Sequence, residues 1–298
     1  MDNIFITGSS GFVGVNLKYY LKNTYNINPK SVRYIPNQTF DIQEDVVIHL
    51  AGKAHDLKKV AQPSAYYEAN FELTKQLFDS FLVSNASTFI FMSTVKAVAD
   101  IVDGFLTEDV IPNPKTHYGI AKYKAEQYIL SKNIPSEKRV YILRPCMIHG
   151  PGNKGNLNLL YQLVSKGLPW PLGDFENKRS FLSIENLCFV IKELLENKSI
   201  ASGIYQVADD QPLSTNEVIK IVNSSLNKKS IIWNIPSSWI KGVSKLGDYL
   251  KLPLNSERLQ KLTESYVVSN TKVLSAIEKS LPITSKDGLL KTFESFKK

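Results

Sequence analysis

The first half of the chain alternates short apolar runs with longer helical patterns. Residues 3–6 (NIFI) form a short β-rich run, and residues 15–21 then carry apolar side chains at helical spacing. Continuous apolar runs, typical of strands buried on both faces of a parallel sheet, follow at residues 46–50, 88–92 and 140–143. Helical patterns at residues 65–83 and 118–130 lie between them. This alternation predicts an α/β fold with a Rossmann-like, doubly wound parallel sheet.

The second half of the chain has a different texture. Residues 151–173 are rich in proline and glycine, a helical pattern returns at residues 184–195, and a strand pattern follows at residues 204–207. Further along, apolar residues at helical spacing predict a basic amphipathic helix with Trp239, Ile240, Val243, Leu246 and Leu250. We expect this helix to pack on its own domain rather than on a membrane.

Chain length and composition limit the number of domains. The 298 residues are 43% hydrophobic and 21% charged, as in a folded protein that buries a sizeable core. Because single cores stop growing near roughly 250–300 residues, we expect a main domain with a smaller companion. The dinucleotide-binding domain would comprise residues 1–150 and about 181–207, and a smaller mixed C-terminal substrate domain would comprise residues 151–180 and 208–298.

Charge and cysteine content exclude several classes of protein. The net charge of +8 suits an anionic partner, but it equally fits a lysine-rich solvated surface. Cys146 and Cys188 form no CxxC pair and the four histidines lack ligand spacing, so we expect neither a disulfide scaffold nor a metal site. The first strand begins almost at Met1 and no apolar run approaches ~20 residues, which predicts a cytoplasmic protein without a membrane span.

A glycine-rich turn directly after the first strand carries the strongest chemical signal. In this turn (TGSSGFVG), Gly8 suits a tight bend, Gly11 lets the backbone approach a pyrophosphate, and Gly14 allows close helix–sheet packing. The turn therefore predicts an NAD(P) site. Its expected contacts are Gly8, Ser10, Gly11, Phe12, Val13 and Gly14.

The adenosine side of this site is less regular. The acidic residue expected at the close of the second strand is absent, and Arg33 occupies that neighbourhood. A guanidinium there favours NADP(H), because it can hold a 2′-phosphate, although a surface arginine would look the same. Residues 31–45 are too few for a complete strand–helix–strand crossover, so we expect a trimmed adenine side.

Hydroxyl and amine side chains predict a proton relay at the carboxyl edge of the sheet. Tyr118 and Lys122 are four residues apart on a predicted helix and therefore share one face. The lysine charge, together with an oxidised nicotinamide, would lower the pKa of the phenol. Ser93 and Thr94 end an apolar strand, where ligands gather in open α/β sheets.

These motifs occur together in the order and approximate spacing of one known family. Further matching segments are HLAG at residues 49–52, LRPCMIHGPG at residues 143–152 and RSFLSIENL at residues 179–187. Over essentially its whole length, the chain resembles the extended short-chain dehydrogenases/reductases of the NAD-dependent nucleotide-sugar epimerase/dehydratase family.

The resemblance implies a role for each matching residue. Tyr118 would be the acid/base, Lys122 would bind the nicotinamide ribose, and Thr94 would hydrogen-bond the reacting oxygen, with Ser93 as the alternative if the register differs by one. Further cofactor contacts would come from Asp41, Ile42, Leu50, Ala51, Gly52, Asn70 and Pro145. Substrate phosphates would be bound by Asn156 at a helix start, by Arg179 and by Arg258, although a solvent-facing role fits Arg258 equally.

The sequence departs from the family pattern at two places, and one of them bears on the type of reaction. Val95 and Lys96 follow Thr94 where the dehydratases of this family carry an Asp–Glu pair, so 4,6-dehydration is disfavoured. Met147 replaces an asparagine of UDP-galactose 4-epimerases, which leaves the substrate contacts open. The resemblance thus implies hydride transfer at C4 of a nucleotide-activated, UDP-linked sugar, by a 4-epimerase or a 4-keto-reductase that makes surface polysaccharide precursors.

Two other functional classes and the assembly state are also considered. A non-catalytic dinucleotide-sensing protein needs no proton relay, so Thr94, Tyr118 and Lys122 together argue against it. A nucleic-acid-binding protein would show a recognition motif or a clustered basic stripe, and the sequence has neither. The helices at residues 65–83 and 118–130 fit a homodimer interface and a buried core equally.

Overall fold

A six-stranded parallel sheet forms the centre of the molecule. The computed structural model describes residues 1–54, 62–153, 155–250 and 255–297. In their order across the sheet, the strands are β2 (Asn26–Lys30), β1 (Asn3–Thr7), β3 (Val46–His49), β4 (Thr88–Met92), β6 (Arg139–Pro145) and β9 (Gly203–Val207). The chain runs from β1 outwards to β2 and returns to β3 on the other side of β1, so the topology switches direction between β1 and β3. The predicted doubly wound, Rossmann-like fold is confirmed.

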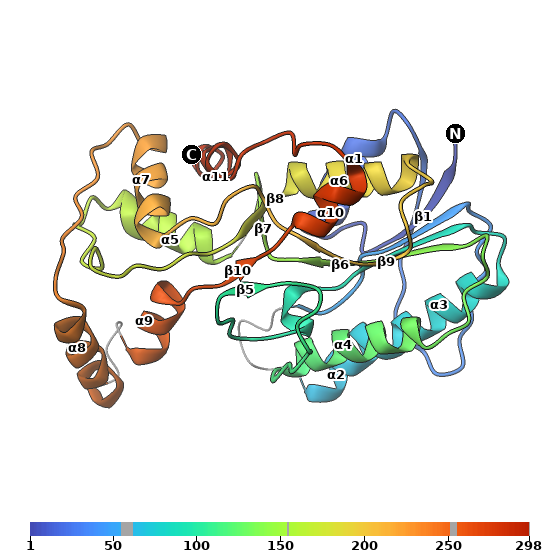
Figure 1. Cartoon of the computed structure of the whole chain (residues 1–298), viewed down its shortest axis with the longest axis horizontal. Coiled ribbons are helices and arrows are strands. Elements are labelled where there is room, and N and C mark those ends of the chain that lie inside the picture. The colour runs from blue at the N-terminus through green and yellow to red at the C-terminus, as the bar shows by residue number, and fades with distance from the viewer. Residues whose placement is uncertain (55–61, 154, 251–254, 298) are drawn as a thin grey trace.

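Helices cover both faces of this sheet (Figure 1). One face carries α1 (Phe12–Leu21), α6 (Ile184–Glu196) and α10 (Thr271–Ile277), and the other carries α2 (Pro63–Tyr67), α3 (Leu73–Val83) and α4 (His117–Leu130). Side chains of β1 alternate between the two layers, since Ile4 and Ile6 join one apolar cluster and Phe5 joins the other. Burial on both sides explains why the strands read as continuous apolar runs.

The structure refines two connections near the cofactor side. The helix expected over residues 65–83 begins at Pro63, and a π-helical turn, η1 (Glu68–Glu72), separates α2 from α3. Single π turns within α-helices are frequent at functional sites, and this one carries Asn70. Residues 31–45, all of them described, contain no helix or strand, which confirms the short crossover expected between β2 and β3.

The remaining elements gather mainly beyond the carboxyl ends of the strands, at the left of Figure 1. They are α5 (Asn156–Ser165), α7 (Thr215–Ser225), α8 (Ser237–Leu250), α9 (Ser256–Thr263), α11 (Ser285–Glu294) and the strand pairs β5 (Phe105–Leu106) with β10 (Val267–Val268) and β7 (Met147–His149) with β8 (Phe181–Ser183). A third apolar cluster, with Leu157, Trp170 and Leu213, lies here. We call α5, α7, α8 and α9 with their connecting loops the second lobe, and the six-stranded sheet with the helices that cover it the first lobe. Among the described residues, no helix has the length and apolar character needed to cross a membrane.

The orientation of α8 corrects one expectation. Of the five apolar residues predicted to pack on their own domain, only Ile240 does so, at 7% exposure. Four side chains lie exposed, namely Trp239, Val243, Leu246 and Leu250. The face that contacts the lobe consists of Ile240, Ser244 and Gly247, which lie about a quarter turn away from the apolar stripe. The reason is that small residues let α8 approach its neighbour α9 closely, so the small face is the buried one.

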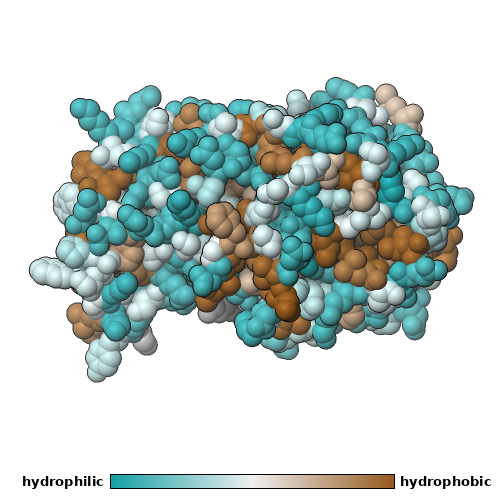
Figure 2. All heavy atoms as spheres, viewed as in Figure 1, coloured by the Kyte–Doolittle hydropathy of each residue, from teal (hydrophilic) through white to brown (hydrophobic). Residues whose placement is uncertain are grey.

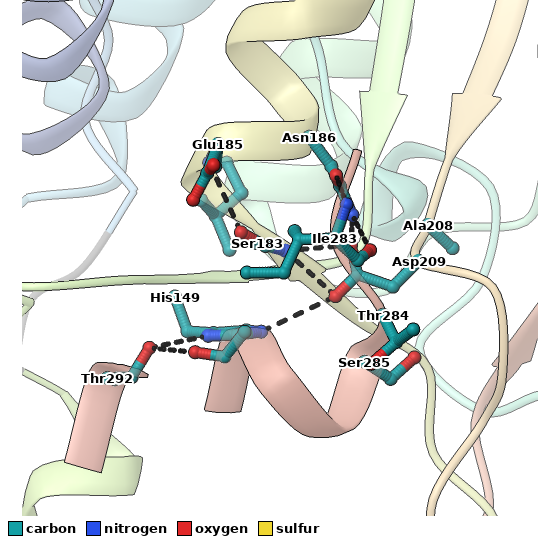
Figure 3. A network of polar contacts seen from close by, with 12 residues as sticks. His149, Ser183, Glu185, Asn186, Ala208, Asp209, Ile283, Thr284, Ser285 and Thr292 are labelled. Carbon is teal, nitrogen blue, oxygen red and sulfur yellow. Dashed lines mark hydrogen bonds and ion pairs between the residues drawn. The ribbon is translucent and has the colours of Figure 1, made fainter. Parts of the chain in front are cut away.

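A buried polar joint fixes the C-terminal segment against the sheet (Figure 3). The Asp209 carboxylate, just after β9, accepts hydrogen bonds from the Ser183 amide at 2.9 Å and from Asn186 Nδ2 at 2.6 Å. Asn186 also donates to the Ile283 carbonyl, and His149 Nδ1 lies 2.9 Å from the Thr292 hydroxyl of α11. The joint thereby ties β7, β8, α6 and α11 together beside the carboxyl edge of the sheet.

Candidate active site

The glycine turn after β1 is built for close backbone approach. Gly8 has φ +67, and a Cβ placed on it would lie 2.6 Å from the Ala51 amide nitrogen. A Cβ on Gly14 would lie 2.6 Å from Ser9 Cα. Gly11 forms the N-cap of α1 without a side-chain hydrogen bond, and Ser10 and Gly11 are exposed. The turn thus presents the positive end of α1, the arrangement that binds a pyrophosphate.

A buried hydrogen-bond chain holds the next loop against this turn. The Thr7 hydroxyl contacts His49 Nδ1 at 2.7 Å and accepts a hydrogen bond from the Ala51 amide at 3.1 Å. His49 Nε2 lies 3.0 Å from the Thr74 hydroxyl, which donates to the Asn70 carbonyl. Burial, with the Lys122 charge as a second cause, holds the pKa of His49 well below its ordinary value. His49 is therefore a neutral connector rather than an acid.

Gly52, Asn70 and Lys122 come together at the carboxyl end of β3. The Asn70 side chain accepts from the Lys53 amide and donates to the Lys53 and Tyr66 carbonyls. A Cβ on Gly52 would lie 2.6 Å from Asn70 Oδ1 and 3.2 Å from Lys122 Nζ. A glycine is needed here because a side chain would collide with both groups. These residues fit a dinucleotide site, since the polar groups of Asn70 and Lys122 meet a bare backbone at the carboxyl end of the strand next to the glycine turn.

The predicted proton relay lies on α4 and the end of β4. Tyr118, which follows a Thr116 N-cap, makes a side-chain hydrogen bond with Thr94. Burial raises the pKa of Tyr118 to about 12, although the Thr94 hydrogen bond acts in the opposite direction. Desolvation outweighs the hydrogen bond in the polypeptide itself, and the lowering expected from Lys122 together with an oxidised nicotinamide stays a prediction. The phenol is therefore a protonated donor at neutral pH.

Lys122 is the buried cation of the site. Its side chain is 3% exposed, and Nζ donates to the Met92 carbonyl at 2.8 Å and lies 4.6 Å from the centre of the Phe91 ring. Burial lowers the pKa of Lys122 to about 7, while the Glu126 carboxylate acts in the opposite direction. Lys122 can consequently change its charge near neutral pH.

The structure distinguishes Thr94 from Ser93. The Ser93 hydroxyl hydrogen-bonds to the Glu126 carboxylate, which also receives Arg144 Nη2 at 2.6 Å. Thr94 caps the short 3₁₀ turn η2 (Val95–Ala97) and is the hydroxyl that Tyr118 contacts. Ser93 is therefore engaged behind the site, and the alternative register is unnecessary.

The residues expected around adenine are more dispersed. Arg33 and Asp41 are exposed, whereas Ile42 is 5% exposed and packs in the core cluster with Phe5 and Val47. Any contact of Ile42 with adenine would thus involve its backbone. Leu50 is half-buried beside the turn, and Pro145 ends β6 at the same edge, paired with Val207 of β9.

The three predicted substrate residues line one cavity of about 1070 Å³ in the second lobe. Asn156 lies at the start of α5, Arg258 lies on α9, and Arg179 precedes β8 and forms β-bridges with Leu213 and Tyr266. Burial lowers the pKa of Arg179, whose Nη2 lies 3.4 Å from the Glu264 carbonyl. The cavity size suits a small-molecule ligand.

Sequence reasoning missed a basic residue whose charge interacts with that of Arg179. Lys96, two residues after Thr94, donates to the Asp100 carbonyl at 2.8 Å and lies 4.3 Å from the centre of the Tyr266 ring. Burial lowers the pKa of Lys96, and the charge of Arg179 contributes in the same direction, so the two cations are neighbours. A single lysine after a strand looks like a surface residue, and only tertiary packing reveals its position.

A second missed residue is Lys30. The register pairs it with Thr7, at the carboxyl end of β2, where the adenosine half of a dinucleotide lies in this fold. Its Nζ lies 3.4 Å from Glu44 Oε1 and its side chain is 43% exposed. Lys30 and Arg33 are thus the two cations at the end of β2 and in the segment after it, and Glu44 pairs with the first of them.

Comparison with known proteins agrees with the geometry. The model of the NAD dependent epimerase/dehydratase family matches residues 4–208. UDP-glucose 4-epimerase of Vibrio cholerae is 30% identical over 99% of this chain and 95% of its own. N-acetyl-alpha-D-glucosaminyl-diphospho-ditrans,octacis-undecaprenol 4-epimerase of Escherichia coli O157:H7 is 28% identical over 91% of this chain and 84% of its own. The structure of RMD from Pseudomonas aeruginosa complexed with NADPH has the same fold, with a TM-score of 0.75 and 22% identity over 99% of both chains. The chain therefore belongs to the NAD dependent epimerase/dehydratase family.

Proposed function

We propose that this chain transfers a hydride between NADP(H) and C4 of a hexose carried on a diphosphate, as a 4-keto-reductase or a 4-epimerase. The observation that carries the proposal is the Tyr118–Thr94 hydrogen bond at the carboxyl edge of the sheet, with Lys122 one turn along α4. Hydroxyl, phenol and ammonium groups in one buried site can hold an oxygen and move its proton.

The residues of the glycine turn, with Gly52, Asn70 and Lys122, would hold the dinucleotide. When bound, the nicotinamide supplies the site that gives or accepts the hydride. In ketone reduction, protonated Tyr118 gives its proton to the C4 oxygen while the Thr94 hydroxyl hydrogen-bonds that oxygen. Protonated Lys122 stabilises the phenolate that remains. Oxidation of the alcohol uses the same groups in reverse.

The diphosphate would lie between the catalytic side chains and the second-lobe cavity. Lys96 and Arg179 are the neighbouring cations at that point, and Arg258 and the α5 start with Asn156 lie beyond them. The Vibrio cholerae relative is named for a UDP-sugar and the Escherichia coli relative for a sugar diphospho-undecaprenol. A sugar diphosphate is the part that these two names share, and UDP is the first carrier to test.

Dehydration is disfavoured by the groups beside Thr94. Val95 is 4% exposed and apolar, and the Lys96 ammonium is directed to the Asp100 carbonyl. Neither side chain supplies the carboxyl groups that the dehydratases of this family carry at these two positions.

The test of the function uses a UDP-4-keto-6-deoxy-N-acetylhexosamine with NADPH, followed by nicotinamide absorbance. Tyr118→Phe should lower kcat by about 10³-fold or more, since proton transfer by a positioned acid contributes typically 10²–10⁴-fold. NADPH affinity should change little. Tyr123→Phe, a half-buried tyrosine of the same helix, is the matched control. Full activity of Tyr118→Phe would contradict the role of Tyr118 as the proton donor.

The same assay separates the two reactions. Consumption of NADPH in proportion to product identifies a reductase. Tightly retained NAD, detected by mass spectrometry, with interconversion of two 4-hydroxy sugars and no net consumption, identifies an epimerase.

The choice of NADP(H) rests on Lys30 and Arg33 and has its own test. Removing both cations in Lys30→Ala/Arg33→Ala should raise KM for NADPH about tenfold, as expected for two partly exposed contacts to a phosphate. KM for NADH should stay unchanged. Lys22→Ala removes an exposed cation elsewhere on the same lobe and serves as the control. Equal effects on both cofactors would count against the proposed phosphate contact.

A further inference from the structure

The walls of the second-lobe cavity are largely apolar, and five cations lie among its lining residues, namely Arg179, Lys228, Lys229, Arg258 and Lys261. Most of its lining residues are apolar, with Leu157, Leu160 and Trp170 among them. Two polar residues of the α7 wall make hydrogen bonds to the protein itself, since Thr215 donates to the Leu262 carbonyl and Asn223 to the Ile219 carbonyl. A uridine needs several hydrogen-bond partners for its base and ribose. An isoprenoid chain needs only apolar contact, which this wall provides.

Exposed apolar side chains concentrate around this cavity. Twenty large hydrophobic side chains are exposed among the described residues. Ten of them either line the cavity, as Leu159, Leu163 and Leu168 do, or belong to the seven between residues 231 and 250. Figure 2, drawn in the view of Figure 1, shows hydrophobic residues in several groups on both sides of the molecule. Half of the exposed large hydrophobic side chains nevertheless belong to the cavity rim and to residues 231–250.

A continuous segment leads from the cavity to α8. Ile231 lines the cavity and is 52% exposed, and the neighbouring backbone pairs with residue 170 through hydrogen bonds of 2.8 Å. Trp233 follows at 53% exposure, and the amide of Ser237 at the start of α8 donates to Asp174 at 2.8 Å. The cavity rim and α8 are thus held in one frame, at the end of the molecule farthest from the N-terminal strand (Figure 1).

The exposed stripe of α8 has the composition of a membrane-surface helix. Trp239, Val243, Leu246 and Leu250 follow helical spacing along one face, and Tyr249 is 86% exposed beside them. Between residues 228 and 250 the chain carries four lysines and one aspartate, a net charge of +3. Tryptophan and tyrosine favour the bilayer interface, and lysines attract anionic lipids.

We propose that the sugar of this enzyme is carried on a polyprenyl diphosphate, with the isoprene units nearest the diphosphate in the second-lobe cavity and α8 resting in the surface of an anionic membrane. The sugar chemistry rests on the proposed function. The cavity is at the upper end of ligand-site volumes, so it holds only part of a long polyprenyl chain. The rest of such a chain stays in the bilayer, and α8 positions the cavity next to it.

The docking part is tested by flotation of the full chain with vesicles. Binding is expected to vesicles of phosphatidylglycerol and phosphatidylethanolamine, and much less to pure phosphatidylcholine. Trp239→Ser/Val243→Ser/Leu246→Ser should lower the partition coefficient at least about tenfold, because all three side chains lose apolar contact with lipid. Tyr19→Ser/Val83→Ser changes two residues that are 72% and 88% exposed on the first lobe and should bind as the parent does. Equal binding of the stripe variant and the parent, or a dimer that depends on the stripe without vesicle binding, overturns the docking.

The carrier part is tested by turnover of one 4-keto or 4-hydroxy sugar on two carriers, UDP in solution and diphospho-undecaprenol in the anionic vesicles. Leu163→Glu places a charge at a cavity residue that is 43% exposed, and should lower kcat/KM for the polyprenyl substrate at least about tenfold. Leu130→Glu, at a residue 53% exposed on α4, is the control and should leave it unchanged. Turnover of the UDP-sugar alone overturns the inference and leaves the proposed function standing. Turnover of neither substrate contradicts the proposed function itself.

Discussion

The sharpest physical consequence of the site is the cost of keeping Lys122 ionised. Its pKa is lowered from 10.5 to about 7 by burial. Because the folded-state pKa lies below the unfolded one, the unfolded chain binds more protons between these two values. The contribution of Lys122 to the free energy of unfolding therefore rises with pH from about 7 to 10.5 and is lowest below pH 7. Because each pH unit across this range changes the free energy of unfolding by ~1.4 kcal/mol, burying the Lys122 charge costs several kcal/mol.

Lys122→Met tests this reasoning because methionine keeps the length and loses the charge. Urea unfolding of the parent and the variant should show the variant more stable at pH 6. The difference should shrink by about 3 kcal/mol between pH 7 and 9, which is two units of the depressed range. Lys124→Met removes an exposed lysine of the same helix, and its difference from the parent should not vary with pH. A pH-independent difference for Lys122→Met would show that Lys122 is solvated and would refute the buried-cation site.

Three further substitutions probe other parts of the fold. Gly14→Ala places a Cβ 2.6 Å from Ser9 Cα, so NADPH affinity in a fluorescence titration should fall at least about tenfold, whereas Gly242→Ala, with no heavy atom within 4 Å, should leave it unchanged. Glu126→Gln removes the charge that pairs with the 2% exposed Arg144 and should cost about 3–5 kcal/mol in chemical unfolding; a loss under 1 kcal/mol would contradict the pairing. Asp209→Asn turns an acceptor into a partial donor against the Ser183 and Asn186 donors, and should cost about 1–3 kcal/mol with earlier proteolysis of the C-terminal segment.

Much of the first lobe could be predicted because its constraints are local. Strands buried on both faces must be apolar throughout, so runs such as residues 88–92 indicate a parallel sheet directly. The positive φ of Gly8 explains why glycine occurs there, and the four-residue spacing of Tyr118 and Lys122 follows from helix geometry. These features depend only on residues that are close in the sequence, so they can be predicted from the sequence alone.

The partners of single charged residues could not be predicted from the sequence, because tertiary packing determines which groups they meet. Lys96 lies beside Arg179 only because the loop after β4 and the segment before β8 meet in space. Glu126 looks like one polar position of a helix, yet it is fully buried and joins Arg144 of β6 to Ser93, the residue after β4. The direction of Ser93 away from the site, which selects Thr94 as the partner of Tyr118, follows from that long-range contact.

The orientation of α8 shows a related limit. Periodicity defines the apolar face of a helix, but it does not say which face is covered. In α8 the buried face carries Ile240, Ser244 and Gly247, and the apolar stripe is exposed. The same distinction applies to the proposed function, in which the reaction depends on the groups at the sheet edge and the choice of carrier on the side chains that line the cavity. Tyr118→Phe should accordingly abolish turnover with either carrier, whereas Leu163→Glu should act on one carrier alone. Equal loss on both carriers from Leu163→Glu would mean that the cavity supports the sheet edge itself.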